Sequence, residues 1–121
     1  MELKNTPHID KIIDYQAFID ETGLDENTIK ELYQVFHDEI LAEKEKLVNS
    51  YSQNDLLKLG KTVHNIKGIS GSFKVGHVFE QACIIDLDIK NGKFQGMGDS
   101  LETFTRSIDC AVKDIRRHFD M

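Results

Sequence analysis

The sequence predicts an all-α protein, an antiparallel up-down-up-down four-helix bundle with a short additional N-terminal helix. Apolar residues recur at helical spacings of three and four along nearly the whole chain, and no internal repeat or low-complexity linker interrupts them. Short loops join four long helical segments, which suits an antiparallel bundle. With 121 residues and 40% hydrophobic content, the chain is expected to form a single domain over 1–121, with 1–8 flexible.

The first two helices are predicted from their end signals. Asp14 can cap a short helix from Tyr15 to about Thr22, and Gly23 is placed to end it. Asp25 is the expected N-cap of a long second helix that runs to about Ser50. The buried stripe of this second helix is predicted to be Ile29, Leu32, Phe36, Ile40 and Leu47, opposite a solvated face of Glu39, Glu43, Lys44, Glu45 and Lys46.

The remaining three helices follow from the same spacing rules. Ser52 or Asn54 is expected to open the third helix, whose core seam is Leu56, Leu59, Val63, Ile66, Ser70 and Phe73. The fourth helix, from about Gly76 to Lys90, offers Val78, Ala82, Ile85 and Ile89. After the glycine-spaced loop NGKFQGMG, Asp99 is the expected cap of a last helix with the stripe Leu101, Phe104, Ile108, Ala111, Ile115 and Phe119.

Composition narrows the classes of partner and location. The formal net charge is -6 and no long basic run is present, which argues against nucleic acid and against an acidic membrane surface. No stretch approaches the roughly 20 apolar residues of a membrane span, and the segment MELKNTPHID lacks the apolar block of a signal peptide. We therefore expect a soluble cytoplasmic protein, with Cys83 and Cys110 as reduced, packed thiols.

One histidine stands in an unusual setting. With the seam of the third helix fixed, His64 points away from the core, and its neighbours one turn away are Gly60, Lys61, Lys67 and Gly68. Each glycine costs roughly 1 kcal/mol relative to alanine inside a helix, so stability alone does not explain the pair. Small neighbours let another surface reach the imidazole. This arrangement suits a nucleophile whose reaction partner arrives on a second protein.

The alternatives for these residues are simpler. His64 can simply be an exposed histidine without a function, and Lys67 a solvated lysine without one. The other histidines are expected to lie at the surface or at helix ends; they are His8, His37, His77 and His118. A metal site that uses His64, His77 and a carboxylate is a third interpretation, although no pair of ligands at i, i+4 supports it.

The stretch around His64 resembles a known family, the histidine-containing phosphotransfer (HPt) domains of multistep phosphorelays. The family pattern is His, any residue, Leu or Ile, Lys, Gly, any residue, then Ser or Ala. Here it is matched in full by His64, Asn65, Ile66, Lys67, Gly68, Ile69 and Ser70. The likeness covers about residues 12–90 and continues in the fourth helix at Val78, Ala82, Ile85 and Asp86. One departure is Lys74, where the family usually has a turn glycine; Gly76 is expected to take over that turn.

The resemblance implies a phosphorelay intermediate without kinase activity of its own. His64 would accept a phosphoryl group on Nε2 from a receiver-domain aspartate and pass it to another receiver, with Lys67 stabilising the charge. The expected docking surface is Gly60, Lys61, Asn65, Gly68 and Gly71, within a basic patch of Lys61, Lys67 and Lys74. The chain would bind no cofactor, because the receiver brings Mg²⁺.

The resemblance also indicates which classes of protein are the partners, and two other functions remain open. The expected partners are response-regulator receiver domains and a hybrid sensor histidine kinase, and the chain is expected to be a monomer. An HPt-like adaptor that docks receivers without being phosphorylated is one alternative. A metal- or ligand-binding helical bundle is the other.

Overall fold

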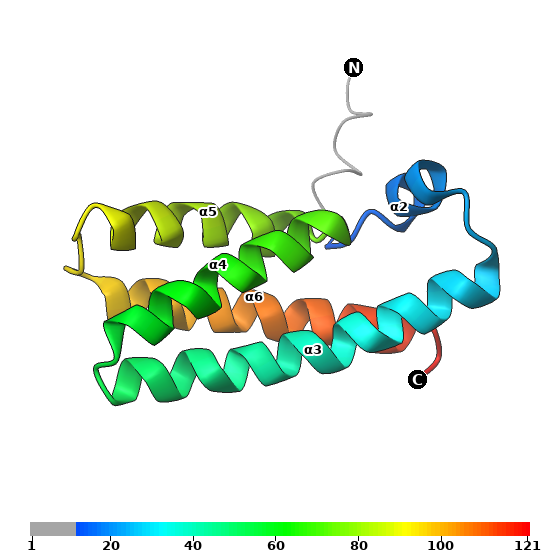
Figure 1. The fold of residues 1–121 in the computed structure, drawn as a ribbon. Helices are drawn as coiled ribbons and strands as arrows, with labels where there is room; N and C mark the ends of the chain where they lie inside the picture. The colour runs from blue at the N-terminus through cyan, green and yellow to red at the C-terminus, as the bar shows by residue number, and fades with distance from the viewer. Residues whose placement is uncertain (1–11) are drawn as a thin grey trace, which may run out of the picture.

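The computed structural model describes residues 12–121, which form five α-helices and no strand (Figure 1). The short helix is α2 (Tyr15–Thr22), and the long ones are α3 (Glu26–Ser52), α4 (Leu56–Ser72), α5 (Gly76–Lys90) and α6 (Met97–His118). Helices α4 and α6 each pack against α3 and α5, so the long helices form a bundle, and α2 lies at one end of it. The prediction of an all-helical bundle is confirmed, whereas the predicted flexible segment, 1–8, lies outside the described residues.

Local capping chemistry explains the starts of the first two helices. A side-chain oxygen of Asp14 accepts a hydrogen bond from the backbone N–H of Ala17, and Asp25 does the same for Thr28 at 2.8 Å. Gly23 ends α2 in the left-handed conformation, with a φ of 66° that costs glycine little. The sequence predictions for these two caps and for this helix end are confirmed.

Two other helix starts were predicted at the wrong residue. The cap of α4 is Asp55, which accepts from the N–H of Lys58, because α3 continues to Ser52 and Asn54 occupies a left-handed turn position with a φ of 56°. Helix α6 begins at Met97 after the left-handed Gly96, so Asp99 lies within the first turn and does not cap the helix.

The turn between α4 and α5 differs from the prediction. Gly76 does not adopt the left-handed conformation; it is the first residue of α5, and Lys74 itself has the positive φ of 64°. Contacts with α2 accompany this less favourable backbone. The Lys74 ammonium pairs with Glu21, and the Lys74 carbonyl accepts from the N–H of Asp14 at 3.0 Å. A lysine therefore takes the place of the turn glycine while tying α2 to the bundle.

An aromatic cluster fills the end of the bundle beneath α2. Its centre is Tyr33, which the predicted stripe of α3 omits although it lies four residues after Ile29. The Tyr33 ring is fully buried, and its hydroxyl donates to the carbonyl of Phe73 at 2.7 Å. Burial raises the pKa of this hydroxyl. The rings around Tyr33 are those of Tyr15, Phe18, Phe36, Phe73 and Phe119.

Several predicted burials are wrong in an instructive way. Glu43 and His37 were expected at the surface but are buried, and each is paired with a polar side chain of a neighbouring helix. The His37 Nε2 atom accepts from Arg116 of α6 at 2.9 Å, and its Nδ1 lies 3.0 Å from a carboxylate oxygen of Asp38. Conversely, Leu56 was placed in the core seam but is exposed, since it is the first residue of α4.

The helices are amphipathic, with apolar residues on the buried face and polar residues on the exposed face. No helix within residues 12–121 has the length and apolar character needed to cross a bilayer. In α3, for example, Leu47 is buried while Glu45 two positions earlier is exposed. Both cysteines are free thiols; Cys83 is half-buried, but Cys110 is exposed and not packed as predicted.

Candidate functional site

His64 lies on the exposed face of α4, beside a groove between α4 and α5. Val63 and Ile66 are fully buried on either side of it in sequence, and they fix the rotation of the helix so that the imidazole faces outward. The groove has a volume of about 470 Å³ and is lined by His64 together with Leu56, Leu57, Gly60, Lys61, Asn65, Asp86, Ile89 and Lys90. The predicted exposure of His64 is confirmed.

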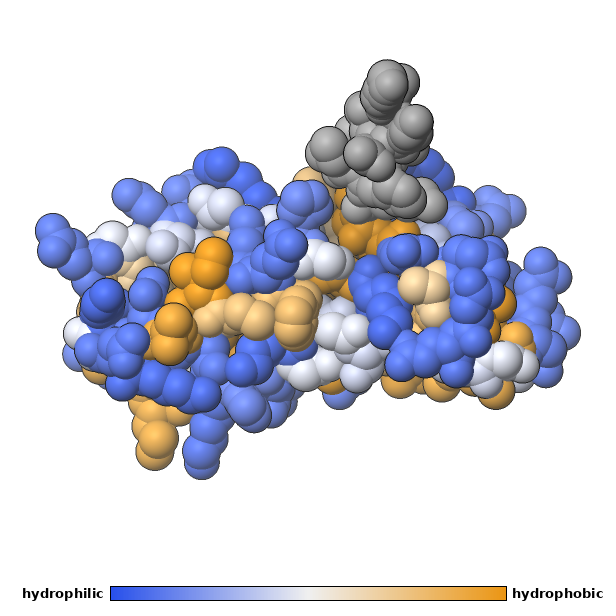
Figure 2. All heavy atoms as spheres, turned by 90° about the horizontal axis from the view of Figure 1, so that it is seen from above, coloured by the Kyte–Doolittle hydropathy of each residue, from blue (hydrophilic) through white to orange (hydrophobic). Residues whose placement is uncertain are grey.

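Hydrophobic side chains are exposed near this groove. Leu57 lies on the same face of α4 as His64, because the two are seven residues apart, and it is 73% exposed. Figure 2, which views the molecule from above Figure 1, shows hydrophobic atoms exposed among hydrophilic ones on the face that is seen there. The exposed imidazole thus lies on a surface that also carries lysines and apolar area.

The three glycines that the sequence groups around His64 have different surroundings. A Cβ atom added at Gly68 would meet nothing within 4 Å, so this position opens to the outside. At Gly60 it would lie in ordinary contact with Ile89, 3.5 Å away. At Gly71 it would lie 3.0 Å from the ring of Phe79. Gly71 therefore serves the close approach of α4 and α5, whereas only Gly68 of the three leaves its space empty.

This difference predicts opposite responses to the same substitution. We expect Gly68→Ala to raise the free energy of unfolding by up to about 1 kcal/mol, because alanine is the better helix former and meets no neighbour. Gly71→Ala should gain less or lose stability, because the Phe79 ring must move. Urea unfolding of both variants measures the difference. Equal gains at the two positions would contradict the packing role of Gly71.

Lys67 is held by a buried carboxylate on α5. Its Nζ lies 2.9 Å from Oδ2 of Asp86, and the Nζ of Lys90 lies 3.0 Å from the same oxygen. Asp86 is only 5% exposed. Burial raises the pKa of this carboxyl, but the hydrogen bonds from Lys67 and Lys90 outweigh burial and hold the pKa below its ordinary value. The hydrogen bond to Asp86 likewise raises the pKa of Lys67.

The charges of this cluster do not cancel. Two ammonium groups share one carboxylate, which leaves one net positive charge at the rim of the His64 groove. A lysine ammonium has three N–H donors, so Lys67 can keep its bond to Asp86 and still donate to an incoming anion. Asp86 thus positions Lys67. From the sequence, Asp86 was noted only as an acid that matches the HPt pattern in the fourth helix.

The lowered pKa of Asp86 predicts how stability depends on pH. A folded-state pKa below the unfolded value near 3.9 contributes stability above that value, and the contribution is lost as pH falls through the folded pKa. We expect Asp86→Asn to lower the urea midpoint at pH 7, by more than the half-buried control Asp88→Asn. The deficit of Asp86→Asn should shrink toward pH 3. A deficit that is unchanged between pH 7 and pH 3 would contradict the ion-pair account.

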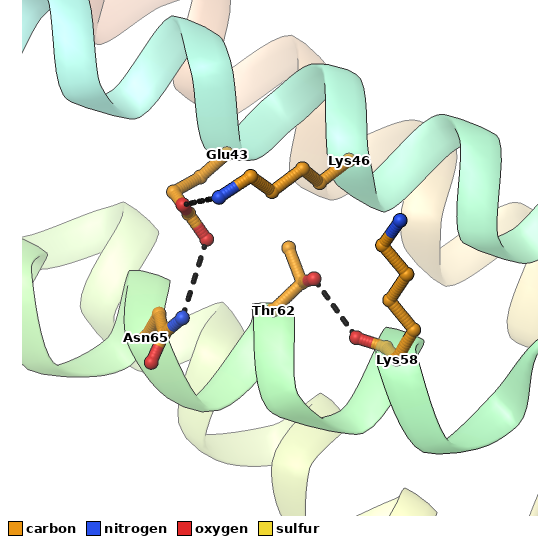
Figure 3. Close-up of polar contacts among 5 residues, drawn as sticks. All are labelled: Glu43, Lys46, Lys58, Thr62 and Asn65. Atoms are coloured by element: carbon orange, nitrogen blue, oxygen red, sulfur yellow. Dashed lines mark hydrogen bonds and ion pairs between the residues drawn. The ribbon is translucent and has the colours of Figure 1, made fainter.

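On its other side, the helix of His64 is tied to α3. The amide nitrogen of Asn65 donates to Oε1 of the buried Glu43 at 3.5 Å, and the other carboxylate oxygen accepts from Lys46 at 3.0 Å (Figure 3). Figure 3 also shows Thr62 of α4 between these groups and Lys58, whose carbonyl accepts from the Thr62 hydroxyl. Asn65 therefore lines the groove of His64 and also ties α4 to Glu43 of α3.

The structure brings together only part of the predicted basic patch. Lys67 is paired with Asp86, and Lys74 lies in the turn after α4 with its ammonium on Glu21 of α2. Lys61 is exposed and has no ion-pair partner among residues 12–121. Nevertheless α4 as a whole carries three lysines and no carboxylate, in a chain with a formal net charge of -6. The helix of His64 is therefore the basic element of an acidic protein.

Sequence reasoning missed two residues that shape the site. Lys90 joins the Asp86 cluster because α5 runs beside α4, a relation that no local pattern reveals. The burial of Glu43 could have been predicted, since Glu43 is three residues after Ile40 and four before Leu47, on the buried face of α3. Within residues 12–121, no three His, Cys, Asp or Glu side chains are grouped so as to hold a metal ion.

Comparison with known proteins adds no relative to this description. No family model matches the chain, and neither a curated protein nor a solved structure matches it. A function is therefore inferred from the residues of α4 and α5 and from their geometry.

Proposed function

We propose that this chain is a phosphorelay intermediate that carries a phosphoryl group on His64. One observation carries the proposal: an exposed imidazole stands one turn from a glycine with open space and from a lysine fixed by a buried carboxylate. We infer also that the four long helices form an antiparallel up-down-up-down bundle, which holds α4 as a rigid platform. The chain would act in the cytoplasm as a monomer and would not be a kinase.

The proposed reaction has two symmetrical steps. A lone pair on Nε2 of neutral His64 attacks the phosphorus of a receiver's aspartyl phosphate, the N–P bond forms, and the aspartate leaves as a carboxylate. In the second step a carboxylate of another receiver attacks, and the imidazole leaves. A neutral imidazole has a lone pair on one ring nitrogen, so it can act as a nucleophile without a dedicated base. The Mg²⁺ in each step would belong to the receiver.

The charged groups beside His64 suit this role. The phosphoryl oxygens carry negative charge through both steps, and the Lys67–Asp86–Lys90 cluster presents one net positive charge at the groove rim. The three lysines of α4 would also attract an acidic receiver pocket during encounter. Exposed Leu57 adds apolar contact area on the same face.

Lys67 can be tested by removing its ammonium. We expect Lys67→Ala to slow transfer from a phosphorylated receiver by roughly tenfold to a hundredfold, the scale of one hydrogen bond to a charged group. Lys58→Ala is the matched control, because Lys58 is an exposed lysine of the same helix outside the groove. Single-turnover labelling measures both rates. Equal slowing by the two variants would reduce Lys67 to a general contributor of surface charge.

The proposed function itself is tested with a panel of receiver domains, each phosphorylated with a radioactive small-molecule acyl phosphate and then freed of it. We expect at least one receiver to transfer label to the chain within minutes, in an acid-labile and alkali-stable form. A receiver that binds in a pull-down but transfers no label would favour the adaptor alternative. No transfer and no binding across a complete panel from the source organism would contradict both.

A further inference from the structure

A second surface lies on the opposite edge of α5, where it meets α6. We call it the α5–α6 surface, and it consists of Gln81, Ile84, Ile85 and Leu87 of α5 with Ser100 and Thr103 of α6. All of these except Leu87 line a groove of about 210 Å³. Ile84 is 61% exposed and Leu87 is 59% exposed, three positions apart on one helix. Two large aliphatic side chains therefore face outward beside a hollow between two helices.

The α5–α6 surface is bordered by carboxylates. Glu80, Ile84 and Asp88 are spaced by four and share a face of α5, and Asp99 stands next to the groove residue Ser100 on α6. None of the three acids forms an ion pair with another of the described residues, 12–121. This sign of charge is the reverse of that on α4, whose charged residues are all lysines. The two surfaces thus attract different partners.

Gln81, which lines the groove, carries a hydrogen-bond acceptor without a partner. In the described part of the chain, Oε1 of Gln81 is the one buried side-chain nitrogen or oxygen that has no hydrogen-bond partner. A buried acceptor without a donor is costly, so an N–H group toward which the Gln81 side chain could turn would be stabilising. The acceptor of Gln81 and the carboxylates that border this surface both favour a partner that donates N–H groups and carries positive charge.

We propose that the α5–α6 surface docks a cationic amphipathic helix of a partner protein. Its apolar stripe would cover Ile84 and Leu87 and lie along the groove between α5 and α6, as amphipathic helices do in grooves of this kind. Its lysines or arginines would face Glu80, Asp88 and Asp99. Because Asp86 and Lys90 turn toward α4 whereas this surface faces α6, the helix would leave the His64 groove free.

The test uses the whole chain and a defined peptide. The peptide is an 18-residue helix of leucine and lysine with leucines at i, i+3, i+4 and i+7; one control has the same composition in scrambled order, and another has glutamate for lysine. Amide shifts of the isotope-labelled chain are followed during titration. We expect saturable shifts in residues 80–88 and 99–103, at least tenfold tighter binding than for the scrambled peptide, and no binding of the glutamate peptide.

Substitutions locate the binding surface. The double variant Ile84→Ser, Leu87→Ser should weaken peptide binding at least tenfold, whereas Val48→Ser, an exposed valine of α3, should leave it unchanged. Phosphoryl transfer to His64 should be the same in all three proteins, so the proposal stands or falls separately from the relay function. Equal binding of the scrambled peptide, or shifts spread over other acidic faces, would overturn it. Self-association that the double variant abolishes would also overturn it, because a second copy would then be the occupant.

Discussion

Replacement of His64 by glutamine is expected to abolish phosphoryl acceptance while the fold stays intact. Glutamine keeps polar character at an exposed helical position, so the free energy of unfolding should change by no more than about 0.5 kcal/mol. It has no nucleophilic ring nitrogen, so no N–P bond can form. Labelling from a phosphorylated receiver should fall below detection, as measured by gel autoradiography under alkaline conditions.

The matched control for this variant is His77→Gln. His77 is also an exposed histidine, but it lies in the first turn of α5 and outside the groove of His64. We expect this control to accept the phosphoryl group at the rate of the unaltered chain. Residual labelling of the His64→Gln protein, or loss of labelling in both variants, would remove His64 from its proposed role.

Replacement of Gly68 by glutamine is expected to move stability and function in opposite directions. A Cβ atom at this exposed position meets no neighbour within 4 Å, and the backbone is helical, so the free energy of unfolding should rise by up to about 1 kcal/mol. The same side chain stands one turn from the imidazole, where the backbone of a receiver must approach. In-line transfer tolerates little displacement, and about 1 Å of misplacement can cost a hundredfold in rate.

The comparison with another helical position separates this steric effect from a change in the helix itself. Ser72→Gln lies four residues further along α4, at an exposed position, and should leave the transfer rate unchanged. Circular dichroism melts and single-turnover labelling of both variants give the two quantities. If Gly68→Gln transfers at the full rate, the open space at Gly68 has no part in docking; if it is destabilised, the described surroundings of Gly68 are wrong.

The fold could be predicted wherever the determining chemistry is local. Asp14 and Asp25 each cap the helix that directly follows, so their role is visible in the sequence. Ser52, Asn54 and Asp55 compete within four residues, and the choice of Asp55 depends on how far α3 extends, which its packing decides. Polar residues in the core were missed for a related reason. His37 is buried because Arg116, 79 residues away, supplies its partner.

The candidate site, too, could be predicted only where local sequence determines it. The outward direction of His64 follows from the seam of α4 and could be predicted. Gly68 and Gly71 look alike in the sequence, and only the position of Phe79 on α5 shows that Gly71 is a packing glycine. The pairing of Lys67 with Asp86 likewise depends on the register of two helices. Contacts between elements, and not the residues of either element, therefore set the chemistry beside the histidine.

The most direct test of the central claim is to locate the phosphoryl group after transfer from a phosphorylated receiver. The labelled chain is digested at alkaline pH, and the modified residue is identified by tandem mass spectrometry. The peptide that contains residues 62–67 should carry one phosphoryl group on His64, and ³¹P resonances should show a phosphoramidate at Nε2. Phosphate on His37, His77 or His118, or on a serine or threonine, with His64 unmodified, would contradict the account.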